Sequence, residues 1–175
     1  MSLFQNIIII IVLIIAAGFL SLTEIALAGA RKVKLKILAE SGEIRAQKVL
    51  DLQEQSADFF AASQIGLNAV AILGGILGEA AFRPFFVEML KQFYVGPWLE
   101  TIGFALSFTL VTSLFILFAD LMPKRLAMIA PEKIAISVIE PIQVFIKVCK
   151  PLAWGINAIA NLLFRLFKVN TIRDD

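Results

Sequence analysis

Apolar residues along this chain collect into three blocks, each long enough to cross a bilayer as one helix. The blocks cover approximately residues 3–28, 59–78 and 101–121, and a spanning helix needs about 20 such residues. The first block has too long an apolar core for a signal peptide, and no lysine or arginine precedes it, so we interpret it as a span. The pattern therefore predicts an all-α membrane protein with three transmembrane helices.

A charged stretch over residues 31–54 mixes basic and apolar residues at helical spacing. Ser41 and Gly42 interrupt it in the middle, as is typical of a turn. We predict a cytoplasmic hairpin of two short amphipathic helices lying near the membrane surface.

The last apolar stretch, residues 134–168, carries polar residues at steps of three or four with one longer gap. This spacing predicts a helix with one polar face. We interpret it as an amphipathic juxtamembrane belt helix lying in the interface, with a fourth span as the alternative. Pro141 and Pro151 are expected to bend or divide it. The polar stripe comprises Glu140, Gln143, Lys147, Lys150, Asn157, Asn161, Arg165 and Lys168.

Proline and glycine predict where the spans end and how they pack. Arg83-Pro84 and Gly96-Pro97 mark a loop over residues 79–100, and Met122-Pro123 is expected to end the third span. In the second span, Gly74 and Gly78 form a GxxxG step, which permits close helix approach.

Basic residues predict the orientation of the spans, because cytoplasmic segments carry an excess of lysine and arginine. The loop over 79–100 carries only Arg83 and Lys91. We therefore expect the N-terminus outside and the C-terminus in the cytoplasm. The segments expected on the cytoplasmic side carry Arg31, Lys32, Lys34, Lys36, Arg45, Lys48, Lys124, Arg125 and Lys133.

Composition agrees with a membrane protein and narrows the chemistry. The chain is 59% hydrophobic and 17% charged, with a mean hydropathy of +0.88, whereas soluble domains are about a quarter charged. A net charge of +2 predicts no nucleic-acid surface. The absence of histidine and the single Cys149 exclude an internal disulfide and most soft-metal or acid–base sites. Oxygen ligands for hard cations remain.

Two carboxylates, Glu24 and Asp120, lie within the apolar blocks. Such a charge costs several kcal/mol unless a cationic or polar group meets it, so a chain that keeps two is a candidate for handling a cation. Ser21 shares a face with Glu24 on a helix. The other polar residues of the spans fall at helical spacing too: Gln64 and Asn68 with Ser63 beside them, and Thr109 and Ser113 within about 40° of Asp120 on a helical wheel.

The residues alone leave alternatives open for this polar cluster. Asp120 is also placed to pair with Lys124 one turn on, and Glu24 to pair with Arg31, in a purely structural role. Mg²⁺ would suit Ser21, Asn68 and Asp120. A diamine would suit Glu24 and Asp120 as two anionic ends with apolar walls between them.

Three motifs carry a resemblance over essentially the whole chain: FLSLTEIALAGARKVKLKILAESG, SQIGLNAVAILGGILGEAAF and FILFADLMPKRLAMIAPE. Together they resemble the DUF21 transmembrane domain of the CorC/CNNM family. The resemblance implies a three-span, N-out homodimer in a bacterial inner membrane that transports Mg²⁺, with Na⁺ as a coupling ion. The implied ligands are Ser21, Asn68 and Asp120, with Glu24 as the acid of an SxxE motif. Leu22 and Ala119-Asp120 depart from the commoner Gly and Gly-Glu.

Within that family, GLNAVAILGGI and LFADLMPKR most resemble the bacterial branch that exports putrescine and cadaverine. The resemblance therefore favours a polyamine exporter, with Na⁺-coupled Mg²⁺ efflux and a non-transporting Mg²⁺-sensing module as alternatives. An enzyme is disfavoured, since no Ser-His, Cys-His or paired-Asp motif is visible. Relatives continue into a CBS pair, the expected site of an ATP-type nucleotide, and a CorC/HlyC domain. Residues 1–175 are expected to form one domain without either, and without a cofactor beyond bound Mg²⁺ or Na⁺.

Overall fold

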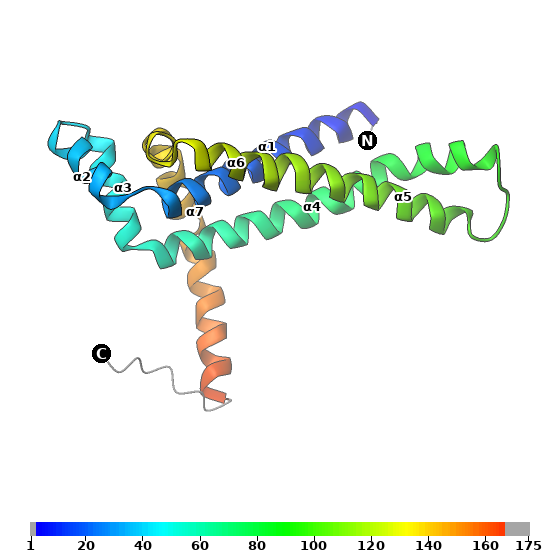
Figure 1. The fold of residues 1–175 in the computed structure, drawn as a ribbon. Helices are drawn as coiled ribbons and strands as arrows, with labels where there is room; N and C mark the ends of the chain where they lie inside the picture. Colours follow the sequence, from blue (N-terminus) through cyan, green and yellow to red (C-terminus); the bar gives the residue numbers. More distant parts are fainter. Residues whose placement is uncertain (1–2, 167–175) are drawn as a thin grey trace.

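A computed structural model describes residues 3–166 as a sequence of helices, with no strand in that range (Figure 1). Three of the helical stretches are long and apolar enough to cross a membrane: Phe4–Gly29, Phe59–Lys91 and Leu99–Ile129. This confirms the prediction of an all-α protein with three spans. The elements are α1 (Leu3–Gly29), α2 (Lys32–Glu40), α3 (Ile44–Glu54), α4 (Ser56–Lys91), α5 (Leu99–Leu114), the π-helical segment η1 (Phe115–Leu121), α6 (Met122–Ile129) and α7 (Pro131–Leu166).

The second span is longer than the sequence predicted, because α4 continues through Pro84 to Lys91. The predicted loop over 79–100 is therefore wrong for residues 79–91. Glu79 and Arg83, which resemble loop residues, instead pair one turn apart along the helix. At 1.5 Å per residue, α4 is roughly 50 Å long, and it exceeds the hydrocarbon core of about 30 Å.

The third span does not end at Met122-Pro123. The backbone widens into η1, where the Met122 N–H donates to the Leu117 carbonyl five residues back, and α6 then continues to Ile129. Proline has no N–H, and its ring clashes with the carbonyl four residues back in an ordinary helix. The widened turn relieves this conflict. The hydrogen bonds before Pro123 are therefore π-helical, and the helix does not end at the proline.

Glycines bring α4 into close contact with α5 and with Phe115, the first residue of η1 after α5. A methyl group added at Gly74 would lie 2.1 Å from the Phe115 ring, and one at Gly78 would lie 2.4 Å from Val111. The predicted role of this GxxxG step is confirmed. At the far end of the pair, Gly103 lies equally close to Val87. We refer to these three contacts, Gly74–Phe115, Gly78–Val111 and Gly103–Val87, as the α4–α5 seam.

The predicted hairpin is present as α2 and α3, with a turn at Ser41 and Gly42. Gly42 has a φ of +100°, which other residues rarely adopt. Leu35 and Val49 are fully buried beneath the hairpin, in the hydrophobic core that joins it to α1, α4, α6 and α7. This core lies where the hairpin meets α7, at one end of the long helices (Figure 1).

Helix α7 begins slightly earlier than predicted, and it stays helical through both Pro141 and Pro151. Its C-terminal half projects away from the three long helices (Figure 1). Within the predicted polar stripe, Glu140, Lys147 and Lys150 are exposed. The side chains of Asn157, Asn161 and Arg165, and all of Lys168, lie outside the described residues.

Two carboxylates of α7 fasten it to the hairpin region, and we call them and their four partners the collar. Glu132 accepts from Arg31 Nε at 3.1 Å and lies 3.5 Å from Lys34 Nζ. Arg31 is thereby engaged away from Glu24, so the alternative pairing of Glu24 with Arg31 is wrong. The second collar carboxylate, Glu140, lies 3.3 Å from Arg45 Nε and 3.4 Å from Lys48 Nζ.

The environment of Glu132 favours its charged form. Its own backbone N–H, at the start of α7, lowers the pKa of the carboxyl, and the Arg31 and Lys34 side chains lower it further against the opposing effect of burial. Glu132 is only 8% exposed, so the collar contains one largely buried and fully compensated charge.

Candidate functional site

Helices α1, α4 and the η1–α6 segment line an open cavity of about 330 Å³. Its volume falls at the lower end of the range of about 300–1,000 Å³ typical of small-molecule sites. Five of the eight residues proposed from sequence line it: Ser21, Glu24, Gln64, Asn68 and Asp120. The remaining lining residues are Ala17, Leu67, Ala71, Phe115, Ile116, Ala119 and Lys124.

Asp120 holds two partners at this cavity. The fully buried Ser21 donates from Oγ to Asp120 Oδ1 at 3.0 Å, across from α1 to η1. Lys124 Nζ lies 2.5 Å from the same oxygen, one turn on along the chain. The predicted pairing of Asp120 with Lys124 is confirmed, and the pair lies in the lining of the cavity.

Glu24 lies one turn beyond Ser21 on α1 and faces α4. Gln64 Nε2 donates to Glu24 Oε1 at 3.2 Å, and no lysine or arginine among the described residues lies within ion-pairing distance of Glu24. Its partner is therefore a neutral amide. Asn68, one turn along α4 from Gln64, lines the cavity with its own amide.

Small residues and the widened turn bring these side chains together. The Gly18 Cα is so close to Pro123 that a methyl group there would lie 3.2 Å from the ring. Because α1 packs tightly on η1 and α6 at this point, Ser21 reaches Asp120. The Phe115 ring, seated on Gly74 of α4, lines the same cavity from η1.

A family model for the cyclin M (CNNM) transmembrane N-terminal domain matches residues 8–175. The chain belongs to this family. The multi-pass fold and the cavity described above are therefore features of a cyclin M transmembrane domain.

Curated relatives of this cyclin M domain carry the name polyamine export protein. The chain is 50% identical to the Escherichia coli protein over 171 residues, which is 98% of this chain and 38% of the relative. It is 45% identical to the Haemophilus influenzae protein over 175 residues, 100% of this chain and 40% of that relative. Identity to the Salmonella typhimurium protein is 51% over 98% of this chain. The chain thus spans well under half the length of these relatives.

The structure does not bring Thr109 or Ser113 to the cavity of the cyclin M domain. Both are exposed on α5, where Ser113 Oγ donates to the Thr109 carbonyl. Their predicted common face with Asp120 assumed a regular helix, and η1 intervenes. A widened turn takes up an extra residue, which rotates the later residues of the helix by about 100°.

Ser63 lies outside the cavity lining and Lys124 lies within it, which is the reverse of what the sequence predicts. Ser63 is fully buried but does not line the cavity, and its Oγ has no hydrogen-bond partner among the described residues. The sequence predicts Lys124 only as a structural partner of Asp120, yet Lys124 lines the cavity beside Asp120. The signal for it was its spacing of four residues from Asp120 on a helix.

The cavity combines two carboxylates, one ammonium group, a hydroxyl and two amides with apolar walls from Leu67, Phe115 and Ile116. No group of three or more Asp, Glu, His or Cys side chains that could hold a metal ion is present among the described residues, and the cavity itself has only two acids. An ion at this cavity would therefore be bound by two carboxylates with hydroxyl and amide oxygens beside them.

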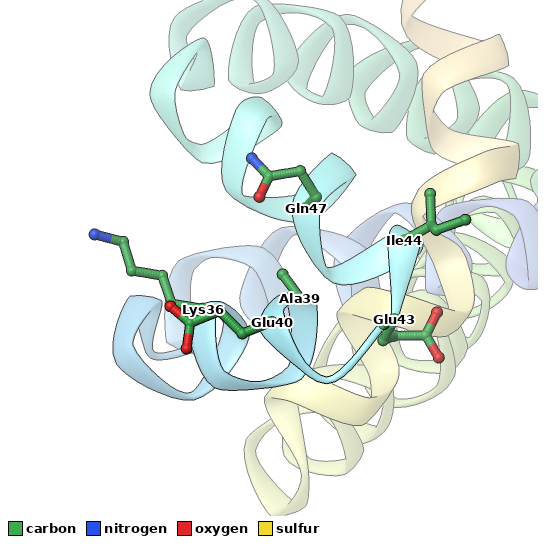
Figure 2. A pocket seen from close by; sticks show the side chains of 7 residues that line it. Lys36, Ala39, Glu40, Glu43, Ile44 and Gln47 are labelled. Atoms are coloured by element: carbon green, nitrogen blue, oxygen red, sulfur yellow. The ribbon is translucent and has the colours of Figure 1, made fainter.

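A larger hollow of about 620 Å³ lies between α2 and α3, lined by Lys36, Glu43 and Gln47 among others. In Figure 2 the Glu43 carboxylate points to one side, and the Lys36 ammonium and the Gln47 amide extend toward the other. Their polar groups do not converge on a common point, so the α1–α4–η1 cavity remains the better candidate site.

Proposed function

We propose that this domain exports small organic cations of the polyamine class, and that Glu24 and Asp120 bind their ammonium groups. The observation that carries the proposal is the cavity itself, where two carboxylates from different helices face one space between apolar walls. A diamine presents two ammonium groups joined by methylene groups, which matches this arrangement. The names of the relatives at 45–51% identity support the same substrate class.

Polyamine is favoured over Mg²⁺ as the substrate. A Mg²⁺ ion bound by Ser21, Asn68 and Asp120 would have to break the hydrogen bond that the Ser21 hydroxyl donates to Asp120, because the Ser21 oxygen would then face the metal. Mg²⁺ also gives up its water reluctantly and demands near-ideal octahedral geometry. An alkylammonium group needs only hydrogen-bond acceptors, which the carboxylates and the Asn68 amide supply.

The proposal includes the setting of the domain. We infer a transporter, not an enzyme, in a bacterial inner membrane, with the N-terminus periplasmic, the C-terminus cytoplasmic and two copies forming a homodimer. The basic residues of the hairpin and α6 support this orientation. No nucleotide or other cofactor is expected in this domain beyond a bound Mg²⁺ or Na⁺.

The test uses purified protein for two measurements, putrescine flux in liposomes and putrescine binding by calorimetry. Asp120→Asn and Glu24→Gln are each expected to weaken binding by about tenfold or more, because each removes a charge-assisted hydrogen bond to an ammonium group. Glu40→Gln, in the exposed hairpin, is the matched control. The proposal fails if the unaltered protein neither binds nor transports putrescine, or if both cavity variants behave like Glu40→Gln. Mg²⁺ flux without putrescine flux would instead support the Mg²⁺ alternative.

A further inference from the structure

We infer that Lys124 is a built-in competitor of the substrate: its ammonium pairs with Asp120 and must release that carboxylate when a polyamine binds there. The inference rests on the proposed function and adds a residue that sets its affinity and selectivity. The contact that carries it is the 2.5 Å approach of Lys124 Nζ to Asp120 Oδ1 within the cavity lining.

The chemistry of Lys124 matches that of the proposed substrate. A lysine side chain is a primary ammonium group on four methylene groups, which is the structural unit of a short aliphatic diamine. The Lys124 ammonium therefore makes the interaction with Asp120 that a substrate ammonium would make. The Asp120 carboxylate carries a single negative charge, which Lys124 already neutralises, so a substrate ammonium that binds this carboxylate competes with Lys124 for that charge.

The surroundings of the pair allow the exchange. The Lys124 side chain is 36% exposed and the Asp120 side chain 47% exposed, so Lys124 can swing away without leaving a buried charge. Ser21 is fully buried, and its hydroxyl comes from α1 rather than from the α6 segment. Asp120 therefore keeps one fixed hydrogen bond when its mobile partner leaves.

Lys124 also sets the net charge that a substrate meets. With Lys124 in place, the cavity holds one positive and two negative side chains, Glu24 and Asp120. A divalent metal ion is favoured by two free carboxylates, so the built-in ammonium disfavours it. A flexible diamine can bind Glu24 first with one end, and then displace Lys124 with the other.

The test measures putrescine binding by calorimetry on the whole protein in nanodiscs, for Lys124→Met and Lys124→Arg. Lys124→Met keeps the side-chain length without the charge, and it is expected to bind putrescine about tenfold more tightly, because Asp120 no longer has to lose a charge-assisted bond. Lys124→Arg is expected to bind several-fold more weakly, since a guanidinium holds a carboxylate with two hydrogen bonds. Lys36→Met, in the hairpin, is the control and is expected to match the unaltered protein.

A second measurement tests the charge argument. Mg²⁺ is expected to compete with putrescine in Lys124→Met and not, at the same concentration, in the unaltered protein. Unchanged or weaker putrescine binding by folded Lys124→Met would overturn the inference while leaving the proposed function intact. Absence of binding by the unaltered protein would instead defeat the proposed function. If Lys124→Met does not fold, Lys124→Arg decides, and unchanged or tighter binding by that variant overturns the inference.

Discussion

The collar and the cavity use the same kinds of charged side chain but differ in their balance. In the collar, Glu132 and Glu140 each have two cationic partners. In the cavity, Glu24 and Asp120 share one, because Gln64 offers Glu24 only a neutral amide. A carboxylate that cationic side chains already neutralise gains little from binding a further cation. A carboxylate without such a partner attracts a positively charged ligand. The comparison separates a cluster that holds helices together from one suited to binding.

The largest expected effect comes from neutralising both carboxylates of one cluster at a time. Glu24→Gln with Asp120→Asn leaves Lys124 as the only charge in the cavity, and putrescine flux in liposomes is expected to fall by about a hundredfold or more, at roughly tenfold per lost charge-assisted bond. Glu132→Gln with Glu140→Gln is expected to keep most of the flux while lowering the thermal unfolding midpoint in detergent. If the collar variant loses as much flux as the cavity variant, the proposed difference in role between the two clusters is wrong.

Gly74→Ala is expected to damage the cavity wall through packing alone. The added methyl group would lie 2.1 Å from the Phe115 ring, and relief of such overpacking costs about 1–3 kcal/mol of stability. Because Phe115 lines the cavity, putrescine binding should weaken as the ring shifts. Gly75→Ala is the matched control, since its methyl group would meet nothing within 4 Å. Equal unfolding midpoints for the two variants would contradict the contact with Phe115.

Acid is expected to weaken the collar through Glu132. Its pKa in the folded protein is lowered from the ordinary value of 4.5, so between the two values the unfolded chain binds more protons. The resulting stability is fully present above about pH 4.5 and is lost as the pH falls through the lower, folded-state pKa. Unfolding midpoints measured across this acid range should fall for the unaltered protein and fall less for Glu132→Gln. Parallel curves would remove Glu132 as the cause.

The smallest expected effect is that of Thr109→Ala with Ser113→Ala. Both hydroxyls are exposed on α5, away from the cavity, and exposed substitutions usually change stability by less than about 0.5 kcal/mol. Putrescine flux is expected to stay within about twofold of the unaltered protein, since neither hydroxyl lines the cavity and the protein stays folded. A tenfold loss of flux would instead support the predicted common face of Thr109, Ser113 and Asp120.

The fold was largely predictable wherever the hydrophobic pattern is uninterrupted. Apolar length located all three spans, and Ser41-Gly42 located the turn of the hairpin. Prediction failed at both prolines of the long spans. Pro84 and Pro123 look like helix ends in a sequence, but the Glu79–Arg83 pair and the widened turn of η1 keep the helices continuous. The spacing of Glu79 and Arg83 does not by itself show that the helix continues past Pro84. A change of helix type such as η1 is not visible in residue periodicity.

The residues of the candidate site show the same contrast between regular helix, where their positions were predictable, and η1, where they were not. Ser21, Glu24, Gln64 and Asn68 lie on α1 and α4 in regular helix, so their spacing correctly predicted shared faces. Thr109 and Ser113 lie on α5, whereas Asp120 lies near the end of η1, where counting at a fixed angle per residue no longer holds. The position of Lys124 depends on that same segment. Its entry into the cavity therefore required the three-dimensional structure.

The α4–α5 seam has an electrical consequence. Its contacts, Gly74–Phe115, Gly78–Val111 and Gly103–Val87, are hydrocarbon on both sides and offer a passing ion no oxygen ligand. Stripping an ion of its water in such surroundings costs of the order of 20 kcal/mol, whereas a voltage of about 100 mV supplies only about 2.3 kcal/mol per charge. With these contacts closed, no ion is expected to pass between α4 and α5.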